Sequence, residues 1–355
     1  MLTQYPHRNL LSDDLPGGWT TGDDTANRSV DLDRFQQGRR SLRSEVVDLG
    51  VRLSATVPGG LAYRCRLTDT GFEAMDVVLD LAYRKRLAEL RAAHERIRES
   101  VSALWLQAAA GDEFLVPGGR NLPAFLDDLE QRNLGALESF ERHPVALGFE
   151  GAFGGRMSIS LESRLSRCCE AVDGPSDVRT VLVDPMHPQR IAQALEVHQC
   201  HFLVPRLDKG RIEVDVRRES LVFAFVLDGV QDRDGADLLP ASALDWLAAH
   251  REGLPLVIEE NLIGCGRAGE LYAFERTPLR ESRPDYIVLN KLFAGWGAKI
   301  GAALVRDDLG DPGLDDSCAS GFGEDEFSLE VALAVFDALD SIDRTELEKR
   351  GGAPV

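Results

Sequence analysis

Basic residues are scarce in this sequence, in which 40 lysines and arginines stand against 59 aspartates and glutamates and give a formal net charge of -19 at pH 7. Such a chain is repelled by the phosphates of nucleic acids and by anionic membrane surfaces. No apolar run approaches the roughly 20 residues that a transmembrane helix needs. We therefore expect no nucleic acid and no membrane among its partners.

Cysteine is also infrequent, and the six cysteines are irregularly spaced. The N-terminus lacks the pattern of a signal peptide, in which charged residues precede an apolar run. This usage is typical of a cytoplasmic protein with reduced thiols rather than of a secreted disulfide scaffold. One short motif, "HQCH", contains the metal-binding side chains of His198, Cys200 and His201. Because a second pair of ligands at zinc-site spacing is missing, we expect no metal site.

A length of 355 residues suffices for one large α/β domain, alone or with a smaller appendage. Residues 1–45 are polar and lack sustained periodicity, which predicts an N-terminal arm. We expect the main domain over residues 46–310 and a C-terminal helical segment over residues 311–355. Between about residues 85 and 140 a helical period, broken at residues 117–119, predicts a helical insertion.

Short apolar runs alternate with amphipathic segments in the second half of the chain. The runs "TVLVDP", "LVFAFVLDGV", "PLVIEEN" and "DYIVLN" have the composition of buried strands. This alternation predicts an α/β fold with a mostly parallel sheet flanked by helices. Because ligands of such sheets gather at the carboxyl ends of the strands, polar residues at strand ends are the candidates for a site.

Two strand ends carry charged residues. Lys291 lies between "YIVLN" and the glycine-rich "LFAGWG". Lys291 is either a structural lysine, whose aliphatic chain covers apolar surface while its amine reaches solvent, or a nucleophilic lysine that forms a Schiff base. Glu259 and Glu260 end the strand "LVIEEN" and fit either an acidic surface loop or paired carboxylates of a site.

Two further turns are candidates. The turn "TDTG" at residues 68–71 opens a predicted helix and fits either a helix cap or an anion site on backbone N–H groups. Phe153 lies in the glycine-rich turn "FEGAFGG" at residues 149–155, where it fits a packed loop aromatic or a ring that stacks on a ligand.

In this order the features resemble the class III aminotransferases, a family of pyridoxal phosphate enzymes with the fold type I architecture. The resemblance covers roughly residues 45–340. It is most specific over residues 254–305, where an acid pair, a G-x-G-R-x-G turn and a Pro-Asp strand ending in lysine follow one another. The matching positions are Gly264, Gly266, Arg267, Gly269, Pro284, Asp285 and Lys291.

The resemblance implies that pyridoxal 5'-phosphate (PLP) is attached to Lys291 as an internal aldimine, and that the same amine moves the proton at the substrate α-carbon. Glu259 takes the place of an aspartate that keeps the pyridine nitrogen protonated. Thr70, Gly71 and Phe72 take the place of the turn that binds the cofactor phosphate.

Four other positions correspond to cofactor contacts of the family. Phe153 matches the aromatic residue that stacks on the cofactor ring, and Asn261 replaces an apolar residue on the other face of the ring. Asp228 lies where the family has a glutamate near the ring hydroxyl. Ser320 stands next to the position that reaches the phosphate of the neighbouring subunit, so the resemblance implies a homodimer with shared active sites.

The sequence also departs from the family pattern. Phe72 stands where a small or hydroxylated residue is usual, and Gly154 stands where a histidine is common. The insertion at about 85–140 is expected to be a lid, a partner surface or a dimer element. Because the chain ends at Val355, soon after the last predicted helix, we expect a reduced or absent C-terminal small domain, which in the family carries the arginine that binds the substrate carboxylate.

The first hypothesis is therefore a PLP-dependent enzyme that acts on an amine or amino acid through aldimine and quinonoid intermediates. The outcome is amino transfer or another reaction of the same carbanion, such as carbon–carbon bond formation, elimination or decarboxylation. The alternative is a non-catalytic homologue that acts as a partner or scaffold protein, which the departures at Phe72 and Gly154 favour. The identity of the substrate stays open.

Overall fold

The computed structural model describes residues 43–60, 62–150, 178–228, 230–231, 237–251, 253–260, 270–289, 299–310 and 326–341. Its helices are α2 (Arg43–Thr56), α3 (Gly71–Ala109), α4 (Leu122–Arg142), α6 (Arg190–Val197), α7 (Ala241–His250), α8 (Glu326–Ser341), and the short η2 (Pro117–Gly119), η3 (Ala273–Arg276), η4 (Pro278–Ser282) and η6 (Asp307–Leu309). Its strands are β1 (Tyr63–Thr68), β2 (Val145–Phe149), β3 (Arg179–Val183), β4 (Gln199–Asp208), β5 (Arg211–Ser220), β6 (Val222–Asp228), β7 (Val230–Gln231), β8 (Asp237–Leu238), β9 (Leu256–Glu259), β10 (Tyr286–Leu289) and β11 (Gly301–Arg306).

The core of the molecule is a seven-stranded sheet with the order β1-β11-β10-β9-β6-β2-β3. β11 is antiparallel to both of its neighbours, whereas all other neighbouring strands of this sheet run parallel. The predicted mostly parallel sheet is therefore confirmed. The carboxyl ends of all its strands except β11 lie along one edge, which we call the carboxyl edge, and the opposite edge is called the amino edge.

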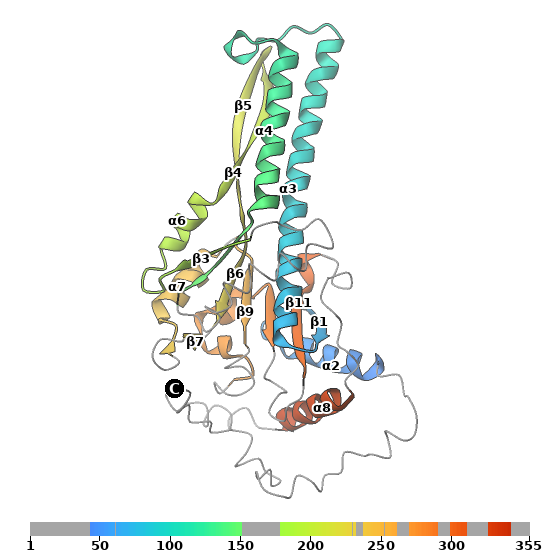
Figure 1. Ribbon diagram of the computed structural model, residues 1–355, viewed down its shortest axis with the longest axis vertical. Helices are drawn as coiled ribbons and strands as arrows, with labels where there is room; N and C mark the ends of the chain where they lie inside the picture. The colour runs from blue at the N-terminus through green and yellow to red at the C-terminus, as the bar shows by residue number, and fades with distance from the viewer. Residues whose placement is uncertain are drawn as a thin grey trace, which may run out of the picture.

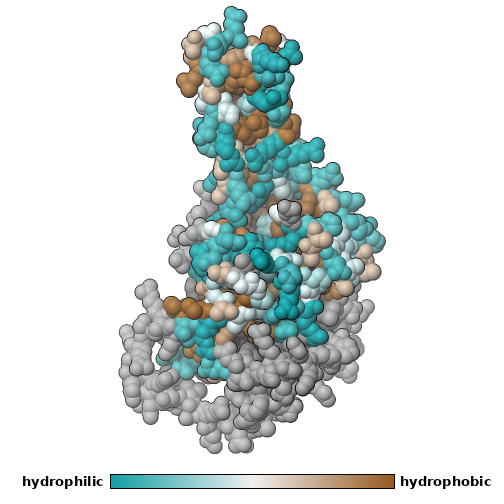
Figure 2. All heavy atoms as spheres, turned by 180° about the vertical axis from the view of Figure 1, so that it is seen from behind, coloured by the Kyte–Doolittle hydropathy of each residue, from teal (hydrophilic) through white to brown (hydrophobic). Residues whose placement is uncertain are grey.

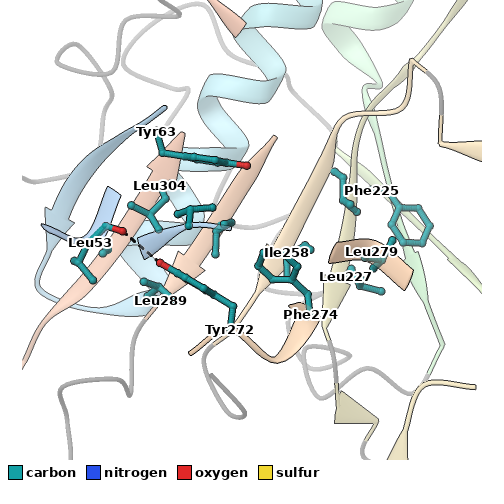
Figure 3. Packing of buried hydrophobic residues seen from close by; sticks show 14 of the residues in the cluster. Leu53, Tyr63, Phe225, Leu227, Ile258, Tyr272, Phe274, Leu279, Leu289 and Leu304 are labelled. Carbon is teal, nitrogen blue, oxygen red and sulfur yellow. Dashed lines mark hydrogen bonds between the residues drawn. The ribbon is translucent and has the colours of Figure 1, made fainter. Parts of the chain in front are cut away.

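The strands are short apolar runs because helices cover both faces of the sheet. In β9, Ile258 packs with α2 and α7 in one hydrophobic cluster, whereas its neighbour Val257 packs in a second cluster with α3. Figure 3 shows the first cluster, in which Leu53 of α2 lies near Leu304 of β11 and Tyr272. The Tyr272 hydroxyl donates a hydrogen bond of 3.4 Å to the carbonyl oxygen of Leu53, which ties α2 to the start of η3.

The helix α3 follows β1 directly and is 39 residues long, which corresponds to about 58 Å at 1.5 Å per residue. Residues 77–83 of α3 are all buried, and beyond Leu87 only one stripe of residues stays buried. The predicted helices between residues 85 and 140 and their break at residues 117–119 are confirmed, but the first of them is a continuation of α3 rather than a separate element. No helix among the described residues is both long and apolar enough to cross a membrane.

A projecting arm is formed by residues 87–142 of α3 and α4 together with the β4–β5 hairpin at residues 199–220, as Figure 1 shows. The side chain of Asn133 on α4 joins the two parts, because its amide donates to the carbonyl oxygen of Leu203 at 2.9 Å and accepts from the Leu203 N–H at 2.7 Å. At the base, Arg86 contacts the carbonyl oxygen of Ser220 and the carboxylate of Glu219. Because β6 begins at Val222, this base lies at the amino edge of the sheet.

The amino edge is fixed by a buried carboxylate. Asp285, 6% exposed, precedes β10 and accepts a hydrogen bond of 2.7 Å from the N–H of Leu256 at the start of β9. Its carboxylate also forms ion pairs with Arg251 at 3.3 Å and Arg306 at 3.0 Å. The Tyr63 hydroxyl donates to the carbonyl oxygen of Pro284 beside this cluster. The ends of β1, β9, β10 and β11 at this edge are thus held by one group of side chains.

Candidate active site

The carboxyl edge of the sheet brings together several residues predicted from the sequence. Glu259 is the last residue of β9, and it lies in register with Asp228, the last residue of β6. On its other side Glu259 lies in register with Val288 of β10. Thr70 and Gly71 follow β1 at the same edge. The predicted residues Lys291, Phe153, Asn261 and Ser320 lie outside the described residues.

Glu259 is buried at this edge, with 7% of its surface exposed. Its strand is a run of four buried residues, and both neighbouring strands shield it from water. The interpretation of the acid pair as an exposed surface loop is therefore wrong. A buried carboxylate at a strand end can accept a hydrogen bond from a protonated ligand nitrogen.

Glu260 is also buried, but it serves the fold. Its carboxylate accepts hydrogen bonds from the N–H groups of Ala273 at 2.9 Å and Phe274 at 3.0 Å, at the start of η3. Its own N–H donates to the carbonyl oxygen of Val288 at 2.9 Å. The N-terminus of a helical turn favours a negative charge. The two adjacent acids therefore have different surroundings, which the sequence did not reveal.

The turn between β1 and α3 is held by three side-chain hydrogen bonds. The Thr68 hydroxyl donates to the carbonyl oxygen of Thr70 at 2.8 Å. The Thr70 hydroxyl oxygen accepts from the N–H of Glu73 at 3.2 Å, so Thr70 is the N-cap of α3. The Glu73 carboxylate accepts from the N–H of Asp69 at 2.9 Å. The cap interpretation of this turn is thus confirmed, and the first turn of α3 presents the N–H groups of Gly71 and Phe72 at the carboxyl edge.

Phe72 is the unexpected residue of this turn. Its side chain is 49% exposed, so it points largely away from the core. The backbone of the turn is therefore not displaced by the large ring, although the ring lies next to the position that the resemblance gives to the cofactor phosphate.

A residue that the sequence did not single out, Gly301, closes the turn from the other side. It lies in register with Thr68 at the start of β11. A Cβ atom at Gly301 would lie 2.6 Å from the carbonyl carbon and oxygen of Thr70 and 2.8 Å from the nitrogen of Gly71. The sequence feature that could have indicated Gly301 is the run "IGAALV", in which a glycine precedes an apolar strand.

The motif "HQCH" does not form a ligand set in the structure. Cys200 is buried on β4, whereas the next residue, His201, is exposed. Successive residues of a strand point to opposite faces, so these two side chains diverge. Among the described residues there is no group of three metal-binding side chains.

Comparison with known proteins gives partial matches. No model of a known protein family matches the chain. It is 35% identical over 91 residues to the diaminobutyrate–2-oxoglutarate aminotransferase of Rhizobium meliloti, which is 24% of this chain and 18% of that protein. It is 30% identical over 132 residues to the acetylornithine aminotransferase of Haemophilus ducreyi, which is 37% of this chain and 33% of that protein.

Solved structures match over most of the chain. The ornithine aminotransferase of Toxoplasma gondii matches with a TM-score of 0.51 and 17% identity, covering 88% of this chain and 55% of that one. A further structure of that enzyme, described with partial occupancy of PLP at its active site, matches with a TM-score of 0.52 and 18% identity over 90% of this chain and 59% of that chain. The chain therefore spans little more than half the length of these structures and a third or less of the curated relatives.

These matches define the fold as that of the large domain of fold type I PLP enzymes. The predicted resemblance to the class III aminotransferases is confirmed, because the matching curated proteins are acetylornithine and diaminobutyrate aminotransferases.

The described residues fit a cofactor with a pyridine ring and a phosphate. The capped turn with Gly71 offers backbone N–H groups at a helix N-terminus, where phosphate binds well. Gly301 has no side chain, which lets the backbone of β11 pack directly against the backbone of this turn. Glu259 supplies a buried carboxylate at the same edge, the kind of group that pairs with a protonated ring nitrogen.

Proposed function

We propose that this chain is part of a PLP-dependent enzyme of aminotransferase type that acts on an amine or amino acid. The observation that carries the proposal is the position of Glu259 at the end of β9, where it lies in register with Val288 of β10. Val288 precedes Lys291 by three residues in the sequence. This is the order of acid and lysine in the family that the sequence resembles. PLP, when bound, supplies an electron sink that stabilises negative charge at the carbon next to the substrate nitrogen.

The chain's own residues have three tasks in this proposal. The carboxylate of Glu259, one methylene longer than the family's aspartate, would hold the proton on the ring nitrogen. The N–H groups of Gly71 and Phe72 hold the phosphate. The amine of Lys291 would attach the cofactor and would move a proton at the substrate carbon.

The proposal includes further contacts and an assembly. Phe153, Asn261 and Asp228 would contact the ring, and Ser320 would contribute to the phosphate site of a neighbouring subunit, so the proposed assembly is a homodimer. A cytoplasmic location accompanies this proposal and agrees with the free thiols of Cys65 and Cys200. Amino transfer is the reaction that the aminotransferase relatives favour.

The test is the colour of the protein. Purified with PLP, the wild-type chain should show visible absorption that Lys291→Ala abolishes. Lys299→Ala is the matched control, because the Lys299 side chain is exposed and its backbone contact survives the substitution. A colourless wild type that cannot be reconstituted with PLP would support the alternative, a non-catalytic partner or scaffold, which the large side chain of Phe72 favours.

A further inference from the structure

Gly301 and the turn at Thr70 and Gly71 are in backbone contact. The atoms nearest to a Cβ placed at Gly301 are the carbonyl carbon and oxygen of Thr70 and the nitrogen of Gly71, all within 2.8 Å. Real Cβ atoms essentially never come this close to another heavy atom. Because these neighbours are backbone atoms, the end of a flexible side chain cannot simply rotate away.

The turn itself cannot yield easily. Thr68 has no exposed surface, and its hydroxyl fixes the carbonyl group of Thr70 that a Cβ at Gly301 would strike. The bonds of Glu73 to Thr70 and Asp69 fix the other side of the turn. An alanine at position 301 would therefore push apart β11 and the first turn of α3 by several tenths of an ångström.

Other glycines in the described residues do not share this contact. A Cβ at Gly50 in α2 would lie 3.5 Å from the nearest atom, and one at Gly135 in α4 would meet nothing within 4 Å. Gly301 also has no left-handed backbone conformation that would require glycine. The need for glycine at position 301 is thus purely steric, and it is specific to the turn that it touches.

We propose that Gly301 is a positioning residue for the phosphate turn, which consists of Thr70, Gly71 and Phe72: its missing side chain sets where the N–H groups of Gly71 and Phe72 lie. This inference rests on the proposed function, since it assigns a role toward the phosphate of PLP. A shift of the turn changes the hydrogen bonds to the phosphate, whose geometry is strict. The ring and aldehyde of the cofactor are held by other residues and are unaffected.

The test compares PLP with pyridoxal, which lacks the phosphate. For Gly301→Ala, titration by absorbance should show PLP binding at least about tenfold weaker, a loss of about 1.4 kcal/mol, and unchanged pyridoxal binding. Gly50→Ala and Gly135→Ala are the matched controls and should bind both compounds as the wild type does. Equal PLP affinity in Gly301→Ala, or an equal loss for both compounds, overturns the inference.

A second variant covers the case in which Gly301→Ala does not fold. Thr68→Val removes the hydrogen bond to Thr70 and loosens the same turn with little change in volume. It should also weaken the binding of PLP but not that of pyridoxal. If the ratio of PLP affinity to pyridoxal affinity stays at the wild-type value, the assignment is contradicted. Failure of the proposed function looks different, because the wild type would then bind neither compound at Lys291. A wild type that binds both equally would leave Lys291 in its role and refute only the phosphate turn.

Discussion

The hydroxyl of Ser328 on α8 accepts a hydrogen bond of 2.8 Å from the backbone N–H of Lys299. Ser328 has no exposed surface, whereas Lys299 is exposed, so this bond is part-buried. Lys299 precedes β11 and follows the stretch of sequence that contains Lys291. The last described helix is therefore connected to the chain segment from which the proposed chemistry comes.

Ser328→Ala should destabilise this connection. The substitution removes the acceptor of the part-buried hydrogen bond from the N–H of Lys299, which costs about 0.5–1.5 kcal/mol. We expect a lower midpoint of thermal unfolding and faster amide hydrogen exchange at residues 299–301. Ser328→Thr keeps the hydroxyl and serves as the control for the hydrogen bond. Exchange at these amides that is unchanged in Ser328→Ala would contradict the role of this bond.

Glu259 and Glu260 should respond differently to neutralisation. Glu259→Gln removes the charge proposed to hold the ring proton, so the absorption spectrum and turnover should change while stability stays close to that of the wild type. Glu260→Ala removes the acceptor of two buried N–H groups and should cost about 1–3 kcal/mol for each. Urea unfolding combined with absorption spectra separates the two effects. If the two variants show the same change in absorption spectrum and in urea unfolding, Glu259 and Glu260 do not have these separate roles.

Asn133→Ala should loosen the arm without affecting the site. It leaves the N–H and carbonyl groups of Leu203 without their side-chain partner, which costs about 1–3 kcal/mol each. Hydrogen exchange at residues 203–205 should accelerate. PLP affinity should stay at the wild-type value, because the arm leaves the amino edge and the site lies at the carboxyl edge. Gly135→Ala on the same helix is the control, and a loss of PLP affinity in Asn133→Ala alone would link the arm to the site.

Two thiols should be unreactive in the folded protein. Burial raises the pKa of Cys65 to about 12 and that of Cys200 to about 11. Because these pKa values exceed the unfolded value of about 8.5, both thiols stay protonated at pH 8 in the folded protein. The stability that they contribute is fully present below the unfolded pKa and is lost as the pH rises from there through the folded pKa. Iodoacetamide at pH 8 should therefore label both only after unfolding, as peptide mass spectrometry can show. Cys200 is buried and Cys65 is partly buried, so rapid labelling of either thiol in the native protein would be inconsistent with its raised pKa.

The main layers of the fold could be predicted because their signals are local. The strands β9 and β10 are short apolar runs, and the helices α3 and α4 have a clear apolar stripe with a break at "VPGG". The position of the arm was not predictable, because it depends on where α3 crosses the sheet. The arm begins at the amino edge and projects away from the sheet (Figure 1), so it does not cover the carboxyl edge of its own chain.

The β4–β5 hairpin was missed because its pattern is irregular. Cys200 and Phe202 are buried near the base of the arm, but Pro205, three positions later, is buried nearer its tip, so the buried face changes along the strand. Two-stranded ribbons twist strongly, which lets one strand present both faces to the same helices. The surface of the arm in Figure 2 correspondingly shows apolar and polar side chains interspersed rather than segregated.

The site was partly predictable for the same reason. The acid Glu259 and the turn at Thr70 follow recognisable strands, and parallel strands place such ends at one edge. The separate tasks of Glu259 and Glu260, and the contact of Gly301 with Thr70, depend on tertiary packing between segments far apart in sequence. Such contacts leave no local pattern, so only the structure shows them.

The central claim is that Lys291 carries the cofactor beside Glu259. Borohydride reduction of the PLP-loaded protein, followed by proteolysis and mass spectrometry, tests it most directly. The account predicts a pyridoxyl group on the peptide that contains Lys291, and no such group in Lys291→Ala. A pyridoxyl group spread over exposed lysines such as Lys299, or found in equal amount in Lys291→Ala, would contradict it.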